Sequence, residues 1–453
     1  MSRKLVIVGN GTAGASIAFA ARKADRTAEI TVLDREPYPT YSKCALPFVI
    51  EGIIKDFEDI TVFSRGFYKQ QKVNLIGNAE VTAIDPDARK VVYRKEGAEH
   101  AIEYDKLGLT TGGYAWQPEI EGDGIGNIFT LRNIADGEKI REAARSAKKA
   151  VVNGASFIAI EVAEALMANG VDTTMIVRSR VVRTMIDADI SRLLMEHLMS
   201  KGLKIVQGST ISRIIGDGQI KAVVAGDEEL PCDMLVNCTG VRSEVSLARK
   251  IGLEMGSKGG IVVDEAMKTA NDDIYTAGDC AEDHFGLMGF PFVSLLGTVA
   301  TRQGVVAGSN MAGVASQAPA FYNAAVLKLF GMQTGSVGLT SDIAEENGLK
   351  VESMRLTHTT LPHYYPGGKP VVIKLLAHPE TQEVLGAQVM AEETVPETIN
   401  TMSLAIQRGM TVSEVAMADF CYAPPCADIW APASVAAQGL ERKLAARARR
   451  KKK

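Results

Sequence analysis

A glycine-rich turn near the N-terminus has the spacing of a dinucleotide site. Gly9, Gly11 and Gly14 follow the apolar segment Lys4–Val8 and precede an alanine-rich stretch. Glycines in a G-x-G-x-x-G pattern allow a tight turn, close approach of the backbone to a pyrophosphate, and close packing of the next helix on the strand. Asp34 ends the following apolar segment, 20 residues after Gly14, where a carboxylate holds the hydroxyls of a ribose. These residues predict a bound dinucleotide, and a glycine turn without a ligand is the weaker alternative.

A second chemical signal lies far along the chain. The segment Thr276–Asp279 follows a short apolar strand and ends in a glycine and an aspartate. The carboxylate of Asp279 can accept a hydrogen bond from a ribityl chain, and Gly278 lets the backbone come close to a ligand. Together with the N-terminal turn, this segment favours a flavin dinucleotide.

Two β-α-β units must position these residues. The first joins strands expected at 4–8 and 29–33, and the second joins strands expected at 149–152 and 173–177. Two such units about 145 residues apart indicate an α/β protein with two Rossmann-like nucleotide-binding domains. After about residue 325, alternating strands and a helix near 396–408 indicate a separate α+β domain.

Composition fits a globular chain and argues against several other classes. Of 453 residues, 46% are apolar and 23% charged, and no apolar run reaches the roughly 18 residues that span a bilayer. The N-terminus does not resemble a secretory signal, so a cytoplasmic location is expected. Six cysteines without a C-x-x-C pair argue against a disulfide scaffold, and six histidines without ligand spacing predict no metal site.

The net charge of −4 hides a basic C-terminus. Residues 442–453 carry eight lysines and arginines and no acid, so the rest of the chain carries −12. Such a run can touch nucleic acid, an anionic partner or a membrane surface. Because no aromatic residue is interleaved for stacking, we favour a solvated, partly disordered extension and expect no nucleic-acid partner.

The sequence resembles the FAD-dependent pyridine nucleotide–disulfide oxidoreductases nearly from end to end. The segments that carry the resemblance are Gly9–Gly14, Asp34, Thr110–Gly113, Gly154–Glu161, Ile274–Glu282 and Tyr422–Pro425. The resemblance implies FAD, NADPH or NADH, and a homodimer. The residues that it assigns to the flavin are Gly9, Gly11, Thr12, Ala13, Gly14, Asp34, Arg35, Ser42, Thr111, Gly112, Arg132, Gly278 and Asp279.

The resemblance also implies a division of the chain into domains. It places an FAD-binding domain at 1–112 and 243–325, an NAD(P)H-binding domain at 113–242, and a dimerisation domain at 326–441. The basic tail at 442–453 follows.

Cys44 determines the branch that the chain resembles. It stands alone in the segment Tyr41–Phe48, where the glutathione reductase type carries a C-x4-C pair. This is similar to the single-cysteine branch of coenzyme A disulfide reductases, NADH oxidases and peroxidases, and persulfide or polysulfide reductases. A thiolate beside an oxidised flavin and at the start of a helix is stabilised by both, and it can attack a disulfide. An inert buried cysteine is the alternative.

The resemblance gives the C-terminal domain a part in the chemistry. The turn Tyr422–Pro425 reaches the partner subunit's active site in the family, which makes Cys426 a candidate second thiol, although simple interface packing is the favoured interpretation of that cysteine. Tyr422 and one tyrosine of the Tyr364–Tyr365 pair are expected to assist the thiolate by donating a hydrogen bond to it. We favour Tyr365, with an interface aromatic as the alternative. The remaining cysteines that lie near apolar strands and are expected in the core are Cys232, Cys238 and Cys280.

Coenzyme A carries phosphates, so its site should be basic. Arg22 stands where coenzyme A-using members of the family carry an arginine. Lys43 and Lys69 are further candidates, although lysines on helices are usually just solvated. The resemblance therefore implies coenzyme A as a further ligand.

The second glycine turn departs from the family pattern. Only Gly154 keeps a glycine, while Ser156 and Ala159 replace the other two. Val177 replaces the usual acid of the ribose, and arginines follow at 178, 180 and 183, which favours the 2′-phosphate of NADPH. A weakened or unusual site is the alternative. The residues assigned to the nicotinamide nucleotide are Gly154, Ser156, Phe157, Ile158, Glu161, Arg178, Arg180 and Gly240.

Three hypotheses about function follow. The first is an NAD(P)H-dependent reductase of a low-molecular-weight disulfide, persulfide or polysulfide, linked to coenzyme A. The second is an oxidase or peroxidase in which Cys44 cycles through a sulfenic acid, although no histidine lies near residues 10–13, where dedicated peroxidases carry one. The third is a flavoprotein that takes electrons from a docked protein.

Overall fold

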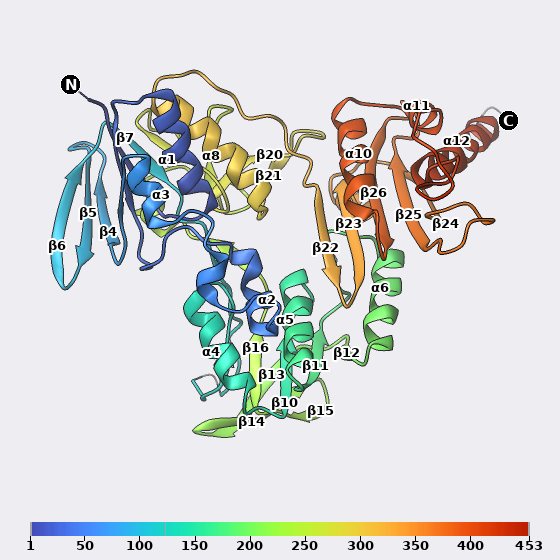
Figure 1. Ribbon diagram of the computed structural model, residues 1–453, viewed down its shortest axis with the longest axis horizontal. Coiled ribbons are helices and arrows are strands. Elements are labelled where there is room, and N and C mark those ends of the chain that lie inside the picture. The colour runs from blue at the N-terminus through green and yellow to red at the C-terminus, as the bar shows by residue number, and fades with distance from the viewer. Residues whose placement is uncertain (1, 123, 452–453) are drawn as a thin grey trace. The chain divides into compact units, whose positions relative to one another are not determined.

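The computed structural model describes residues 2–122 and 124–451 and divides into two compact units. The first unit comprises residues 2–117, Thr130–Arg141 and Gly240–Phe321, and the second comprises Pro118–Phe129, Glu142–Thr239 and residues 322–451. Each unit contains a parallel sheet flanked by helices (Figure 1). The predicted α/β fold class is therefore confirmed.

The first unit is built on a five-stranded parallel sheet in the order β19-β7-β1-β2-β3. Leu5 and Ile7 of β1 face a core formed with two helices, while Val6 and Val8 face a second core on the other side. A strand buried on both faces explains why this segment is continuously apolar. The elements of the sheet and its two packed helices are β1 (Lys4–Val8), β2 (Glu29–Leu33), β3 (Val73–Ile76), β7 (Lys106–Leu109), β19 (Ile274–Thr276), α1 (Thr12–Ala24) and α8 (Gly297–Met311).

Shorter elements complete the first unit. A three-stranded antiparallel sheet is formed by β4 (Glu80–Asp85), β5 (Lys90–Lys95) and β6 (Ala98–Glu103). The other elements are η1 (Lys43–Ala45), α2 (Leu46–Glu51), η2 (Phe57–Ile60), α3 (Arg65–Gln70), β8 (Gly113–Ala115), β17 (Val241–Ser243), α7 (Ser246–Lys250), β18 (Ile261–Val262), β20 (Ala281–His284) and β21 (Pro291–Phe292). Helix α4 (Ile134–Ala144) begins in this unit.

The second unit starts with another five-stranded parallel sheet, in the order β12-β11-β10-β16-β9. Helix α5 packs on β10 and β11, as the predicted β-α-β unit requires. The elements are β9 (Ile128–Phe129), β10 (Lys149–Asn153), α5 (Phe157–Ala168), β11 (Asp172–Val177), α6 (Ala188–Ser200), β12 (Lys204–Gln207) and β16 (Met234–Asn237). An antiparallel sheet of β13 (Ile211–Asp217), β14 (Gln219–Ala225) and β15 (Glu228–Pro231) accompanies them.

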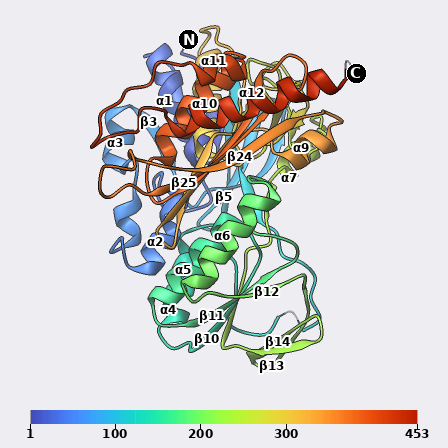
Figure 2. The ribbon, with the colours of Figure 1, turned by 90° about the vertical axis from the view of Figure 1, so that its right-hand side faces the viewer.

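The second unit ends in a five-stranded antiparallel sheet, in the order β22-β23-β26-β25-β24. Helix α10 packs on β23 and β26, and α12 packs on β24 and β25 (Figure 2). The elements are β22 (Ala325–Leu329), β23 (Met332–Gly338), α9 (Ser341–Glu346), β24 (Glu352–Thr359), β25 (Pro370–Ala377), β26 (Val384–Ala391), α10 (Val395–Gln407), α11 (Val412–Ala416) and α12 (Pro432–Lys451). This confirms the predicted α+β domain.

The basic C-terminus differs from the prediction. Residues 442–451 are not a partly disordered extension but the end of helix α12, and residues 452–453 lie outside the described residues. Leu440 and Leu444 are buried one turn apart. Lys443 and Arg447 on the same helix form ion pairs with Glu352 of β24. Apolar anchoring and these ion pairs hold the basic segment on the sheet.

Candidate functional site

The three glycines of the first turn have different surroundings. A Cβ atom on Gly9, whose φ is +100°, would lie 2.2 Å from the carbonyl oxygen of Thr110, and one on Gly14 would lie 1.9 Å from that of Gly9. A Cβ on Gly11 would meet no atom of the described chain within 4 Å. Gly11 is also the N-cap of α1, so the N–H groups of the first turn point to the open side of the turn. Packing requires Gly9 and Gly14, while Gly11 leaves the room that a pyrophosphate needs.

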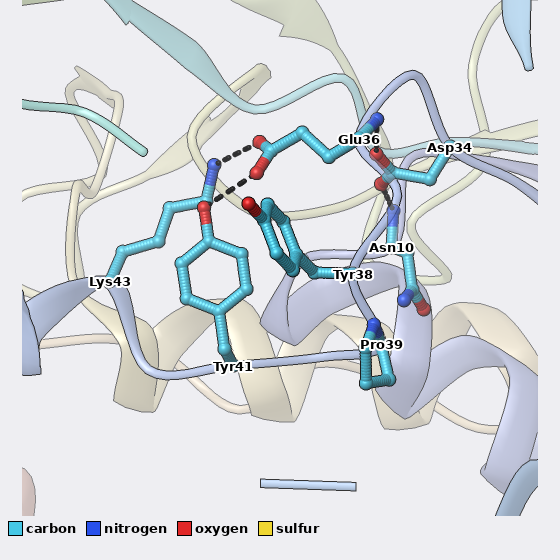
Figure 3. Close-up of a pocket in the computed structure, with 8 residues that line it drawn as sticks. Asn10, Asp34, Glu36, Tyr38, Pro39, Tyr41 and Lys43 are labelled. Carbon is cyan, nitrogen blue, oxygen red and sulfur yellow. Dashed lines mark hydrogen bonds and ion pairs between the residues drawn. The ribbon is translucent and has the colours of Figure 1, made fainter. Parts of the chain in front are cut away.

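Asp34 lies beside this turn and is held by backbone donors. Its carboxylate accepts hydrogen bonds from the N–H of Glu36 at 2.7 Å and from the N–H of Asn10. Burial raises the pKa of Asp34 above its usual range, although these two donors act in the opposite direction. The carboxylate is thus fixed at the end of β2, at the edge of a groove (Figure 3).

The groove has a polar wall that the sequence did not single out. The carboxylate of Glu36 accepts a hydrogen bond from the hydroxyl of Tyr41 at 2.7 Å and lies 3.3 Å from Lys43 Nζ (Figure 3). Lys43, predicted to bind coenzyme A, is therefore engaged by Glu36 at this groove. The lining residues are Asn10, Gly11, Asp34, Glu36, Tyr38, Pro39, Tyr41 and Lys43.

A buried amide under the turn fits a bound ligand. The Asn10 side chain is 5% exposed, and its Oδ1 accepts a hydrogen bond from the hydroxyl of Tyr68 at 2.5 Å. Its Nδ2 is buried and has no hydrogen-bond partner among the described residues. An unsatisfied buried donor costs about 1–3 kcal/mol, which a ligand oxygen would recover. The open cradle at Gly11, the fixed Asp34 and this donor fit the adenosine diphosphate half of FAD.

The predicted flavin residues far along the chain form an ion pair. Arg132 Nη2 lies 2.6 Å from the carboxylate of Asp279, and Arg132 Nε donates to the carbonyl oxygen of Gly113 at 2.9 Å. Gly278 has φ of +82°, which only glycine adopts readily. Within the first unit, this brings together Arg132, Gly278 and Asp279, three of the residues predicted to bind the flavin.

Cys44 lies at the middle of η1, directly before α2. Its side chain is exposed. The turn is anchored by Leu46 and Ile50 of α2, both 1% exposed, and by the 2.9 Å hydrogen bond from the N–H of Ser42 to the carbonyl oxygen of Ile60. The residue is therefore exposed rather than buried, and its catalytic role stays a prediction.

The three strand-associated cysteines are in the core, as predicted. Cys232 and Cys238 are 2% and 8% exposed, and Cys280 is fully buried. Burial raises the pKa of the Cys232 and Cys238 thiols to about 12. A thiol with such a pKa is a poor nucleophile at neutral pH.

In the second glycine turn, a serine side chain caps the helix that follows. Gly154 has φ of +139°, and a Cβ there would lie 2.3 Å from the carbonyl oxygen of Cys238. Ser156 is the N-cap of α5, and its hydroxyl accepts a hydrogen bond from the N–H of Ala159 at 3.3 Å. One donor that a glycine would leave to the pyrophosphate is therefore used within the protein. This is the physical cost of the serine that the sequence indicated.

Glu161 stands on α5, one turn after that cap. Burial, together with the nearby charge of Glu164, raises the pKa of Glu161 to about 7. A carboxyl group with this pKa changes its charge within the physiological range. The acid predicted to lie near the nicotinamide is therefore a titrating group of the second unit.

We predict that Glu161→Gln removes a pH-dependent loss of stability. Because the folded-state pKa is raised above the ordinary value of 4.5, the folded protein binds the proton more tightly, and stability falls as pH rises from about 4.5 to 7. The amide cannot ionise, so the thermal midpoint of the variant should fall less between pH 5 and pH 8 than that of the unmodified protein. Parallel pH profiles of the two proteins would show that Glu161 titrates normally.

The arginines after β11 have unequal surroundings. Arg178 and Arg183 are exposed. The Arg180 side chain is only 15% exposed, because it donates to the carbonyl oxygen of Ile186 and forms an ion pair with Asp342. The sequence grouped Arg178 with Arg180 at the nucleotide site, and the structure gives Arg180 a partner within the protein.

The tyrosines of the C-terminal domain form a pair. The hydroxyl oxygens of Tyr364 and Tyr422 lie 2.6 Å apart, and both side chains are exposed, at 61% and 44%. Their hydrogen bond raises the pKa of Tyr364. Tyr365, which the sequence favoured, is not part of this pair. Tyr364 is therefore the better placed partner of Tyr422.

The turn beside Tyr422 presents two exposed cysteines. The carbonyl oxygen of Ala423 accepts hydrogen bonds from the N–H groups of Cys426 at 2.8 Å and Ala427 at 2.9 Å, which closes the Pro-Pro turn. Cys421 and Cys426 are both exposed. The structure supports a presenting turn, and the catalytic role of Cys426 stays a prediction.

Arg22 has a structural task that the sequence did not indicate. Its guanidinium donates five hydrogen bonds of 2.8–3.2 Å to backbone carbonyl oxygens, and a guanidinium has five donors. Its contact with coenzyme A stays a prediction, although its five donors already form hydrogen bonds within the protein. Lys69 lines a shallow pocket with Arg65 and Tyr68 in the same unit.

Residues 2–122 and 124–451 contain no candidate metal site and no candidate membrane span. No group of three or more histidine, cysteine or acidic side chains there is arranged to hold a metal ion. No helix in these ranges has the length and apolar character needed to cross a membrane.

Comparison with known proteins matches this architecture. The pyridine nucleotide-disulphide oxidoreductase model covers residues 3–315, and the model of that family's dimerisation domain covers residues 324–434. The chain is 35% identical to an NADH oxidase of Methanocaldococcus jannaschii, over 97% of this chain and 99% of that one. It is 32% identical to an NAD(P)H coenzyme A polysulfide/persulfide reductase of Pyrococcus horikoshii, with the same two coverages. A solved NAD-dependent persulfide reductase from A. fulgidus gives a TM-score of 0.94 at 31% identity, over 97% and 83% of the two chains.

The fold has two parallel sheets of the nucleotide-binding type and a C-terminal antiparallel sheet, as in oxidoreductases with a dimerisation domain. The chain belongs to the pyridine nucleotide–disulphide oxidoreductase family, and it is an NAD(P)H-dependent flavoprotein oxidoreductase. The resemblance drawn from the sequence is confirmed.

Proposed function

We propose that the protein reduces a low-molecular-weight disulfide, persulfide or polysulfide, linked to coenzyme A, with Cys44 as its single redox thiol. The observation that carries this proposal is an exposed cysteine on an anchored turn in the unit that holds the flavin-type site. No cysteine stands five residues after it, where a C-x4-C pair would have one. The Pyrococcus horikoshii relative, whose name includes coenzyme A and persulfide, supports the substrate class.

The chemistry follows from a single thiolate. Cys44 attacks a disulfide R–S–S–R, forms a mixed disulfide with one half and releases the other half as R–S⁻. Two electrons and a proton then cleave the mixed disulfide to the Cys44 thiolate and R–SH. The Gly9–Gly14 turn and Asp34 would hold FAD, which would supply these two electrons from NAD(P)H. With a persulfide R–S–SH, the first step releases HS⁻ instead. One NAD(P)H is consumed for each sulfur–sulfur bond.

Reduction of oxygen or peroxide is a second candidate, because the Methanocaldococcus jannaschii relative is named an NADH oxidase. Steady-state assays separate the two. Under strict anaerobiosis, NADPH or NADH should be oxidised with coenzyme A disulfide, coenzyme A persulfide or polysulfide as the only acceptor. This rate should exceed the rate of oxidation in air-saturated buffer that contains no sulfur acceptor. Faster consumption with oxygen than with every sulfur acceptor would favour the oxidase.

The domain assignment belongs to this proposal. We assign FAD to 1–112 and 243–325, NAD(P)H to 113–242, and dimerisation to 326–441. The match of residues 324–434 to a dimerisation domain supports a homodimer.

We predict that Arg178→Ala shifts nucleotide preference from NADPH toward NADH. Arg178 is exposed directly after β11, whose end lies beside the Gly154 turn, and this position supports a role in binding a 2′-phosphate. A charge-assisted contact contributes about 1.5–3 kcal/mol, so the preference should change by roughly 10- to 100-fold. Steady-state kcat/KM values with both nucleotides measure it. Better use of NADH by the unmodified protein would contradict the assignment.

We predict that Tyr422 acts on the site of the other subunit. A Cys44→Ser chain and a Tyr422→Phe chain, each impaired alone, should regain disulfide turnover when mixed and allowed to exchange subunits. One of the two sites in each mixed dimer then has both native groups. Native mass spectrometry would verify that subunits exchange. If turnover does not rise after exchange, Tyr422 acts in its own subunit's site or has no catalytic role.

A further inference from the structure

The loop after β11 lies across the second glycine turn. Before the loop, the N–H of Gly154 donates to the carbonyl oxygen of Ile176 at 3.1 Å. After the loop's first part, the N–H of Val182 donates to the carbonyl oxygen of Ala155 at 2.7 Å. Residues 178–181 are thus held at both ends beside the turn, where the adenosine ribose of a dinucleotide lies in domains of this type.

The loop is held in one conformation. Val182 has φ of +50°, which is unusual for a β-branched residue, and its side chain is 3% exposed. The carbonyl oxygen of Ser179 accepts a 2.6 Å hydrogen bond from the side chain of Gln207. A backbone in such a conformation persists only where its surroundings fix it. The backbone positions of Arg178 and Arg180 are therefore preset.

The two arginines within residues 178–181 differ in their partners. Arg180 forms its ion pair with Asp342, in the first turn of α9 and within the same compact unit. Its guanidinium also donates a hydrogen bond to the carbonyl oxygen of Ile186, which holds it against the protein surface. Arg178 is exposed and takes part in no ion pair within residues 2–122 and 124–451.

We propose that Asp342 is a positioning residue that limits selectivity for NADPH by holding Arg180 away from the 2′-phosphate. A carboxylate and a phosphate compete for the same guanidinium donors, and the carboxylate also cancels the positive charge that attracts the phosphate. With Asp342 in place, residues 178–181 offer Arg178 alone; without its charge, these residues offer two arginines. The inference rests on the proposed nicotinamide site, and it makes the C-terminal domain a determinant of nucleotide specificity.

The test uses binding of adenosine nucleotides to the FAD-loaded protein. Calorimetry gives the dissociation constants of 2′,5′-ADP, which carries the 2′-phosphate, and of 5′-ADP, which lacks it. In Asp342→Asn, 2′,5′-ADP should bind about tenfold tighter while 5′-ADP is unchanged. A merely structural effect of the substitution would change both constants together. Adding Arg180→Ala to Asp342→Asn should return the ratio of the two dissociation constants to that of the unmodified protein.

Two matched variants control for charge and folding. Glu345→Gln removes the same charge from an exposed position of α9, and it should leave the ratio within about twofold. Asp342→Glu keeps the charge and should keep the ratio. If Asp342→Asn does not retain FAD and its thermal midpoint, Asp342→Ser takes its place.

Three outcomes would overturn the proposal. They are an unchanged ratio in Asp342→Asn, an equal gain in Glu345→Gln, or weaker binding of 2′,5′-ADP, which would mean that the ion pair orients Arg180 toward the phosphate. The assay needs neither Cys44 nor a sulfur acceptor, so it stays informative if the proposed sulfur chemistry fails. An unmodified protein that prefers 5′-ADP would refute the NADPH preference, and the change caused by Asp342→Asn would still be measurable.

Discussion

Cys44→Ser should lower turnover with every disulfide or persulfide by more than about 10³-fold, while reduction of the flavin by NAD(P)H continues. Serine keeps the shape of the side chain but is not a nucleophile toward sulfur at neutral pH, and loss of a nucleophile commonly costs this much. Stopped-flow absorbance gives the flavin step, and anaerobic steady-state assays give turnover.

Cys421→Ser is the matched control for this variant. Cys421 is also exposed, but it lies in the C-terminal domain and outside the predicted site residues. Its replacement should leave turnover within about twofold. Disulfide turnover retained by Cys44→Ser would show that another cysteine carries the chemistry.

The second large effect concerns two glycines three residues apart. Gly14→Ala places a Cβ 1.9 Å from the carbonyl oxygen of Gly9, so backbone must move, which typically costs about 1–3 kcal/mol of stability. Gly11→Ala meets no described atom within 4 Å and should fold normally. Its methyl group instead lies where the pyrophosphate approaches, and we expect FAD affinity to fall about 10- to 100-fold.

Thermal unfolding of the apoproteins and titration with FAD separate these two roles. Gly14→Ala should unfold at a lower temperature and purify without flavin. Gly11→Ala should match the unmodified apoprotein in thermal midpoint and differ only in FAD affinity. Tight flavin binding by Gly11→Ala would show that the pyrophosphate of the cofactor does not lie against Gly11.

Features governed by local pattern were predicted well from the sequence. The strands at 4–8 and 29–33 were placed at their observed bounds, because a strand buried on both faces is an unbroken apolar run between turns. The core positions of Cys232, Cys238 and Cys280 follow from the same apolar context. Family membership followed from glycine spacing and the distant Asp279.

Features governed by distant partners were not predictable in this way. Asp342 lies 162 positions from Arg180, and nothing in either segment indicates their ion pair. Neighbouring tyrosines in a loop look alike in sequence, and only the fold pairs Tyr364 rather than Tyr365 with Tyr422. The unsatisfied Nδ2 of Asn10 depends on the orientation of a buried amide.

The basic tail was misjudged for a different reason. Its charge dominated the interpretation, although the apolar spacing from Leu440 to Leu444 was visible and is typical of a helix face. This spacing indicates that the helix continues at least through residue 444.

If Cys44 carries electrons to a sulfur–sulfur bond, peptide mass spectrometry should detect its mixed disulfide during the reaction. Oxidised protein is mixed anaerobically with coenzyme A disulfide, digested and mapped, before and after one equivalent of NADPH. We expect a coenzyme A mixed disulfide on Cys44 alone, which NADPH reduces with release of one equivalent of coenzyme A thiol. An adduct on another cysteine, or a Cys44 adduct that NADPH does not discharge, would contradict it.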